Sequence, residues 1–170
     1  SYLSNTINDF KNFYKTNKSK ELTNLNEMAE KSLNIIEDSI TYKNIKIIKN
    51  FNSRSDIKTY MNEVTQVILT LLQNAEDILL EKQTQNPYIK INTFEDDEYL
   101  YLQVIDNGGG IPQDILDKIF DPYFSTKHEK NGSGLGLYFA KSIIENNCNA
   151  LLTVENNQDE AVFTIRFKKE

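Results

Sequence analysis

Cysteine, histidine and long apolar runs are all scarce in this sequence. The single cysteine, Cys148, excludes an internal disulfide and fits a reducing compartment such as the cytoplasm. One cysteine and one histidine are too few for a structural zinc site. No apolar run approaches 18 residues, which is too short for a membrane-spanning helix. The first residues lack the basic start and apolar centre of a secretory signal, and the chain does not begin with Met, so we expect a fragment of a longer protein.

Positive charge is also in short supply. The 19 Lys and Arg residues are outnumbered by 25 Asp and Glu residues, giving a formal net charge of −6, and no basic stripe is visible. This balance argues against nucleic acid as the main partner. A length of 170 residues with 39% hydrophobic residues is enough for one domain with its own core.

Glycine is both rare and clustered. The chain has 6 glycines, which fall into two groups, Gly108–Gly110 and the alternating Gly132, Gly134 and Gly136. At ordinary usage, about twelve would be scattered among turns. Clustering of all the glycines in two places indicates a functional site rather than a general need for flexible turns.

Hydrophobic periodicity predicts an α/β sandwich of helices on a mixed sheet. A polar stretch at 15–20 is interpreted as a linker, and 121–133 as a loop. The spacing predicts helices over 1–14, 25–42, 57–82, 112–120 and 135–145. Strands are predicted over 45–51, 88–94, 99–105, 150–156 and 161–167.

The first glycine group directly follows a predicted strand that ends at Asp106. Alternation places Asp106 on the same face as Leu100, Leu102 and Val104, so its carboxylate ends a buried row and requires a hydrogen-bond donor. An ordinary Asp-Asn-Gly turn would account for this stretch equally well. Three glycines exceed what a turn needs, however, and would let the backbone approach a flat ligand whose hydrogen bond Asp106 accepts.

The predicted helix 57–82 carries a polar ridge beside its apolar stripe, made by Gln66, Thr70, Asn74 and Asp77. For Gln66 and Asp77 a solvated helix face is the favoured interpretation. Asn74 lies at the margin of the stripe, where its amide oxygen is a candidate ligand for Mg²⁺.

The second glycine group opens directly into a predicted helix. Such a loop presents backbone N–H groups to an anion, and Lys127 and Lys130 add positive charge beside it. A flexible loop is the alternative. We expect His128, the single histidine, to be an exposed loop residue, and the aromatic residues at 120, 123 and 124 to anchor the loop.

Four stretches, "QNAED", "DNGGGIP", "KIFDPYFSTK" and "NGSGLGL", occur in this order. They resemble the N, G1, F and G2 boxes of the catalytic, ATP-binding domain of sensor histidine kinases. The resemblance implies an α+β fold, the two-layer α/β sandwich called the Bergerat fold, with helices packed on one face of a mixed sheet. It further implies that residues 1–19 are the end of a dimerisation and phosphotransfer helix with its linker, and that 20–170 are the ATP-binding domain.

The same resemblance implies ATP and Mg²⁺ as ligands. Asp106 would accept from the adenine amino group, Asn74 would hold Mg²⁺, and residues 120–134 would form a lid. The implied ATP-binding set is Asn74, Asp106, Gly108, Gly110, Ile111, Thr126, Lys127, Gly132, Gly134, Leu135, Gly136 and Leu137. Two positions depart from the family pattern: Thr70 stands where Asn is frequent, and Asp77 where a basic residue is frequent.

The phosphoacceptor histidine of this family belongs to a helix upstream of residue 1, so no catalytic residue is assigned within the chain. The implied partners are the protein's own dimerisation and phosphotransfer domain and a response regulator. The parent would be a homodimer with this domain in the cytoplasm, and it could be anchored in the inner membrane. Two alternatives stay open: an ATPase of the gyrase, chaperone and mismatch-repair group, which carries a water-activating Glu where Thr70 stands, and a non-catalytic nucleotide-binding adaptor.

Overall fold

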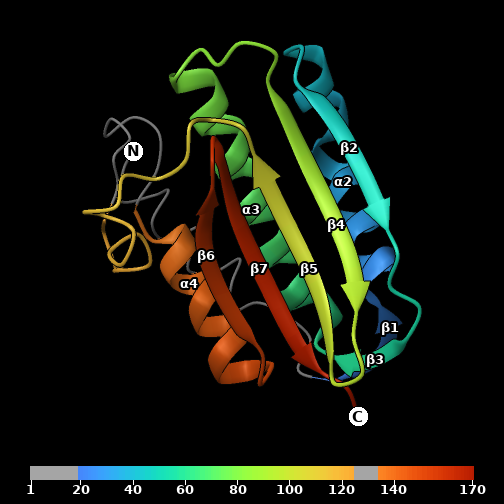
Figure 1. Ribbon diagram of the computed structural model, residues 1–170. Coiled ribbons are helices and arrows are strands. Elements are labelled where there is room, and N and C mark those ends of the chain that lie inside the picture. The colour runs from blue at the N-terminus through green and yellow to red at the C-terminus, as the bar shows by residue number, and fades with distance from the viewer. Residues whose placement is uncertain (1–18, 125–133) are drawn as a thin grey trace.

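The computed structural model describes residues 19–124 and 134–170, which form a mixed sheet with helices on one side and a separate pair of short strands. The sheet has five strands in the order β2-β4-β5-β7-β6 (Figure 1). β2 and β4 are parallel, and the other neighbours are antiparallel. These strands are β2 (Lys46–Phe51), β4 (Tyr88–Glu95), β5 (Tyr99–Asp106), β6 (Leu151–Asn157) and β7 (Glu160–Lys168).

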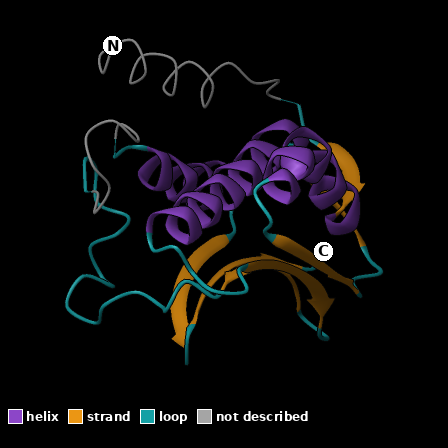
Figure 2. Ribbon diagram, turned by 90° about the horizontal axis from the view of Figure 1, so that it is seen from above, coloured by secondary structure: helices purple, strands orange, loops and turns teal. Residues whose placement is uncertain are grey.

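The helices α2 (Leu25–Tyr42), α3 (Met61–Glu81) and α4 (Gly136–Ser142) cover a single face of this sheet (Figure 2). The core lies between the two layers, where Met28, Leu71 and Ile91 are fully buried. Burial of each such side chain contributes about 1.5–3 kcal/mol. The predicted two-layer sandwich, with helices on one face of a mixed sheet, is confirmed.

Most predicted elements are confirmed. α2 spans the predicted 25–42, and its N-terminus is capped by Asn24, whose side chain accepts from the Glu27 N–H at 2.9 Å. Along β5, Leu100, Leu102 and Val104 are buried as alternation predicted, and β6 and β7 form the predicted hairpin.

The prediction of one helix over 57–82 was wrong at its start. Residues Asp56–Thr59 form strand β3, which pairs antiparallel with strand β1, Glu21–Asn24. Neither strand was predicted, because each has only four residues and its partner lies more than 30 positions away. α3 therefore begins at Met61.

Two further helix predictions need correction. Residues 112–120 form consecutive turns rather than a helix, with the N–H groups of Ile115 and Lys118 reaching back three residues to Pro112 and Ile115. A segment this short has too few hydrogen bonds to offset helix nucleation. The helix predicted over 135–145 is α4, ending at Ser142, followed by one π-helical turn over Ile143–Asn147. The predicted helix over 1–14 lies outside the described residues.

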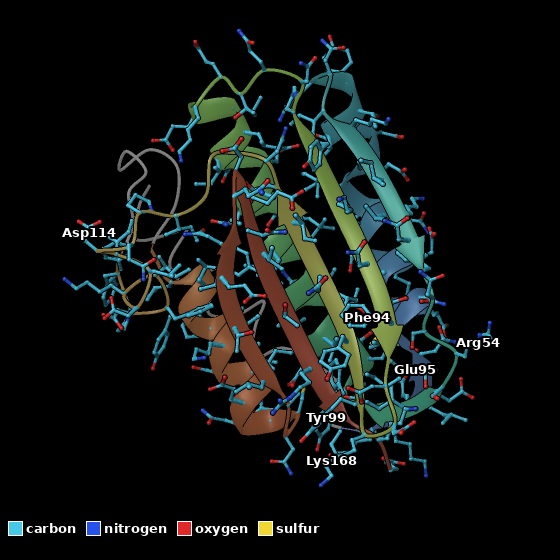
Figure 3. All side chains as sticks on the ribbon, in the orientation of Figure 1. Arg54, Phe94, Glu95, Tyr99, Asp114 and Lys168 are labelled. Atoms are coloured by element: carbon cyan, nitrogen blue, oxygen red, sulfur yellow. The ribbon has the colours of Figure 1, made fainter. Side chains whose placement is uncertain are left out.

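The sheet face away from the helices carries an aromatic group beside the β4–β5 turn (Figure 3). The ring of Phe94 stacks on Tyr101 with centroids 4.7 Å apart, and the Arg166 guanidinium lies 4.2 Å from the centre of the Tyr99 ring. At the same end, Glu95 accepts from the Ser55 N–H at 2.9 Å and pairs with Lys169 at 2.6 Å. This carboxylate joins the β2–β3 connection to the C-terminal end of the chain.

No helix among the described residues is long and apolar enough to cross a membrane.

Candidate nucleotide-binding site

Helix α3 connects the two glycine groups along one face. Thr70, Asn74 and Ile78 follow one another at four-residue spacing, so they lie on the same side of the helix, and all three are half-buried. Thr70 and Ile78 are about 12 Å apart along the axis, at 1.5 Å per residue. Asn74 lies midway between them.

Each end of this face contacts one glycine group. A methyl group placed on Gly136 would lie 3.4 Å from Thr70 Cγ2, and one placed on Gly108 would lie 2.7 Å from Ile78 Cγ2. The second distance is too short for a side chain at its present position. The backbone therefore approaches α3 closely at both ends, with the amide of Asn74 between them.

Asp106 ends strand β5 next to the first glycine group and is only 3% exposed. Its Oδ1 accepts from the Gly108 N–H at 2.9 Å, which supplies the donor that its burial requires. Burial raises the pKa of Asp106 to about 6, although the Gly108 N–H and the charge of Lys82 act in the opposite direction. The carboxylate is thus ionised at neutral pH and disposed to accept a further hydrogen bond.

The first glycine loop, Gly108–Ile111, depends on glycine for its backbone conformation. Gly109 and Gly110 have φ values of 94° and 79°, in the left-handed region that side chains disfavour. Lys82 donates from Nζ to the Gly110 carbonyl at 3.3 Å. Lys82 continues the four-residue spacing one turn beyond Ile78, a signal by which sequence analysis could have found it.

The second glycine group meets the start of α4. Gly134 has a φ of 74°, and a methyl group there would come within 2.8 Å of the Tyr123 backbone. The Tyr123 N–H donates to the Gly134 carbonyl at 2.9 Å, so the two ends of the intervening segment are joined. Leu135 is buried and Leu137 packs against the core, which fixes α4 beside α3.

The structure therefore brings most predicted site residues together. Asn74 lies midway along the α3 face, Gly136 lies at its Thr70 end, and Gly108, whose N–H donates to Asp106, lies at its Ile78 end. Thr126, Lys127 and Gly132 lie outside the described residues, as do His128 and Lys130. Gln66 and Asp77 are partly exposed on α3, and the interpretation of their side of the helix as a solvated face stays a prediction.

Sequence analysis missed two buried carboxylates of α3. Glu63 accepts from Asn147 Nδ2 at 3.2 Å, and Glu76 pairs with Lys43 at 3.3 Å. Both lie on the helix beside the apolar stripe, but their burial depends on partners from the π-helical turn and from the residue that follows α2. The sequence carries no local signal of those contacts.

Asn74 fits a site for a divalent cation that is completed by a ligand. Among residues 19–124 and 134–170, no group of three His, Cys, Asp or Glu side chains is placed to hold a metal ion. Mg²⁺ commonly takes one or two protein oxygens together with phosphates and waters. A half-buried amide oxygen between the two glycine groups matches that requirement.

Comparison with known proteins decides the family. Residues 60–170 match the profile of the family described as histidine kinase-, DNA gyrase B- and HSP90-like ATPases. The chain belongs to this family. The predicted resemblance to sensor histidine kinase catalytic domains is confirmed by the relatives within it.

One relative is the two-component sensor PprA of Pseudomonas aeruginosa, 34% identical over 116 residues, which cover 66% of this chain and 12% of that protein. Sporulation kinase A of Bacillus subtilis is 28% identical over 152 residues, covering 89% and 24% respectively. A solved catalytic domain of histidine kinase ThkA superposes with a TM-score of 0.77 at 28% identity, covering 88% of this chain and 95% of that one. The chain spans 12% to 30% of the length of eight curated relatives.

Proposed function

We propose that this chain binds Mg²⁺·ATP along the α3 face and transfers the γ-phosphoryl group to a histidine on the parent kinase's own dimerisation helices. The observation that supports this most directly is the row Thr70, Asn74 and Ile78, which contacts a glycine group at each end. Its length of about 12 Å suits a nucleotide whose base and phosphates lie at opposite ends.

Different residues bind the base at one end of the row and the Mg²⁺ and phosphates at the other. Asp106 accepts a hydrogen bond from the amino group of adenine, and the first glycine loop lets the base approach the backbone. Asn74 holds Mg²⁺ near the phosphates, with the second glycine group on the other side. The cation, when bound, supplies charge neutralisation; the chain supplies position and alignment, which dominate phosphoryl transfer.

Thr70 favours a kinase over an ATPase of the gyrase and chaperone kind. Its hydroxyl donates to the Gln66 carbonyl within α3 at 3.0 Å, and a threonine cannot act as the general base that activates water. The attacking group of a kinase is instead an imidazole from another domain. We propose that residues 1–19 are the end of the dimerisation and phosphotransfer helix with its linker, and that 20–170 are the ATP-binding domain.

The remaining partners follow from the same assignment. Histidine kinase ThkA, solved in a complex with response regulator TrrA, superposes with a TM-score of 0.76 at 25% identity over 99% of this chain and 48% of that one. We propose a response regulator as the downstream partner, a homodimeric parent anchored in the inner membrane, and a cytoplasmic position for this domain.

Titration calorimetry tests the binding half of the proposal. Wild type is expected to prefer ATP over GTP by about 10- to 100-fold, because guanine presents an oxygen where adenine presents an amino group. Asn74→Ala should bind ATP weakly, and its affinity should be the same with and without Mg²⁺, because the cation loses its protein ligand. Gln73→Ala, at the exposed neighbouring position of α3, is the matched control and should keep the wild-type Mg²⁺ dependence. Equal Mg²⁺ dependence in Asn74→Ala and wild type would remove Asn74 from the metal site.

A further inference from the structure

We propose that Asn156, near the end of strand β6, is a positioning residue for the adenine end of the site. It fixes the first glycine loop, Gly108–Ile111, in the conformation that receives the base. Asn156 lies outside all four sequence boxes. This inference rests on the proposed function, because it assigns a role within the same nucleotide site.

The Asn156 side chain makes two hydrogen bonds with the backbone of Ile111, and these two contacts together form the Asn156 clamp. The Ile111 N–H donates to Asn156 Oδ1 at 2.8 Å, and Asn156 Nδ2 donates to the Ile111 carbonyl at 2.7 Å. The side-chain amide therefore pairs with the backbone as a neighbouring strand would. Two hydrogen bonds from one planar group fix the orientation of the loop as well as its distance from β6.

The sheet register places Asn156 in the same row as Asp106. Asn156 is opposite Ala161 on β7, and Ala161 is opposite Asp106 on β5. Side chains directly opposite one another point to the same face of a sheet. Asn156 and Asp106 thus lie two strands apart, about 10 Å, with only the methyl group of Ala161 between them.

Further contacts hold the loop between the β6–β7 turn and the end of α3. The Gly109 N–H donates to the Asp159 carbonyl at 2.9 Å, and Lys82 reaches the Gly110 carbonyl from the opposite side. A methyl group on Gly110 would lie 3.1 Å from Asn156 Oδ1, so the loop also packs tightly on the clamp. The Asp159 contact is made by its backbone, so a substitution of Asp159 would not remove it. The Asn156 contacts are made by its side chain, so a substitution there does remove them.

The clamp matters because glycine gives the loop many alternative conformations. Two consecutive residues with positive φ are otherwise free to exchange between backbone regions. Ordering them only on ligand binding would weaken affinity, whereas a loop held in place beforehand avoids that cost. Asn156 itself is exposed, so its removal should leave the core intact.

Calorimetric titration of the whole 170-residue chain with Mg²⁺·ATP and with Mg²⁺·tripolyphosphate, which has no base, tests this role. Asn156→Ala should raise the Kd for ATP by about 5- to 30-fold, the range expected for two lost hydrogen bonds. The Kd for tripolyphosphate should change less than about twofold, because the clamp acts at the adenine end. Asn157→Ala is the matched control: it is exposed on the same strand, on the opposite face, and should bind both ligands as wild type does.

The outcomes are distinguishable. If wild type does not bind ATP, the proposed function fails. If wild type binds ATP and Asn156→Ala binds it equally well, Asn156 has no positioning role. An equal loss for ATP and tripolyphosphate, accompanied by a lower unfolding temperature, would show a purely structural role and overturn the inference.

Discussion

Replacing Asp106 with asparagine separates the cost of burying a charge from the benefit of binding adenine. Burial raises the pKa of Asp106 from 3.8 to about 6. One pKa unit corresponds to about 1.4 kcal/mol, so the ionised carboxylate at pH 7 lowers the free energy of unfolding by up to about 3 kcal/mol. Asparagine carries no charge, and its oxygen can still accept from the Gly108 N–H. We expect Asp106→Asn to gain about 1–2 kcal/mol at pH 7, after the burial of its amide is subtracted.

The gain should depend on pH in a definite direction. Because the pKa of Asp106 is higher in the folded protein than in the unfolded chain, the folded protein binds more protons between those two pKa values. The associated stability is fully present below about pH 4 and is lost as the pH rises through about 6. The variant lacks this titration, so its stability relative to wild type should change by about 3 kcal/mol between the two pH values, from a gain of about 1–2 kcal/mol at pH 7 to a deficit of about 1–2 kcal/mol near pH 4, where only the cost of burying its amide is left.

Urea unfolding at pH 7 and at pH 4, together with calorimetric titration of ATP at pH 7, measures both effects. The expected result is a variant that is more stable than wild type at pH 7, less stable than wild type at pH 4, and about 10- to 100-fold weaker for ATP. A variant that is less stable than wild type at both pH values would refute the argument that burial of this charge is costly. Unchanged ATP affinity would refute the role of Asp106 at the base.

Two other substitutions test the geometry. Gly108→Ala should weaken ATP binding, because its methyl group would lie 2.7 Å from Ile78 Cγ2 and 2.9 Å from Asp106 Oδ1; overpacking of this kind costs about 1–3 kcal/mol. The double variant Gly108→Ala with Ile78→Ala should recover part of the affinity in the same titration, and no recovery would contradict this close approach. Glu95→Gln should lower the free energy of unfolding at pH 7 by about 1–3 kcal/mol, because charged groups make the stronger hydrogen bonds. Lys169, Ser55 and Arg54 lower the pKa of Glu95 from 4.5 to about 2, so its contribution is present above pH 4.5 and is lost as the pH falls through about 2. Unfolding curves that show the same deficit at pH 7 and pH 2 would contradict this.

The parts of the fold predicted from sequence are those with a local signal. The helix over 25–42 has a capping Asn24 and an apolar stripe, and β5 alternates between buried and half-buried residues from Tyr99 to Val104. Strands β1 and β3 carry no such signal, since each is stabilised by the other across a long separation. The start of α3 was misplaced for the same reason.

The candidate site divides in the same way. Asn74, Asp106 and the glycines stand out because their residue types are unusual for their positions. Asn156 does not, because an asparagine near a hairpin turn is ordinary in sequence. Its contact with Ile111 and its place in the row with Asp106 depend on the pairing of β5, β7 and β6, which only the folded sheet supplies.

The most direct test of the central claim is transfer of phosphate from radiolabelled ATP. This chain alone should bind ATP without labelling itself, since an acceptor must approach the γ-phosphorus in line and at near contact. Addition of a separate fragment that carries the parent's upstream helices should produce an acid-labile phosphohistidine on that fragment, and Asn74→Ala should abolish the label. Acid-labile label on His128 of the isolated chain would contradict the account, as would ATP binding with no transfer to a fragment that associates with the chain.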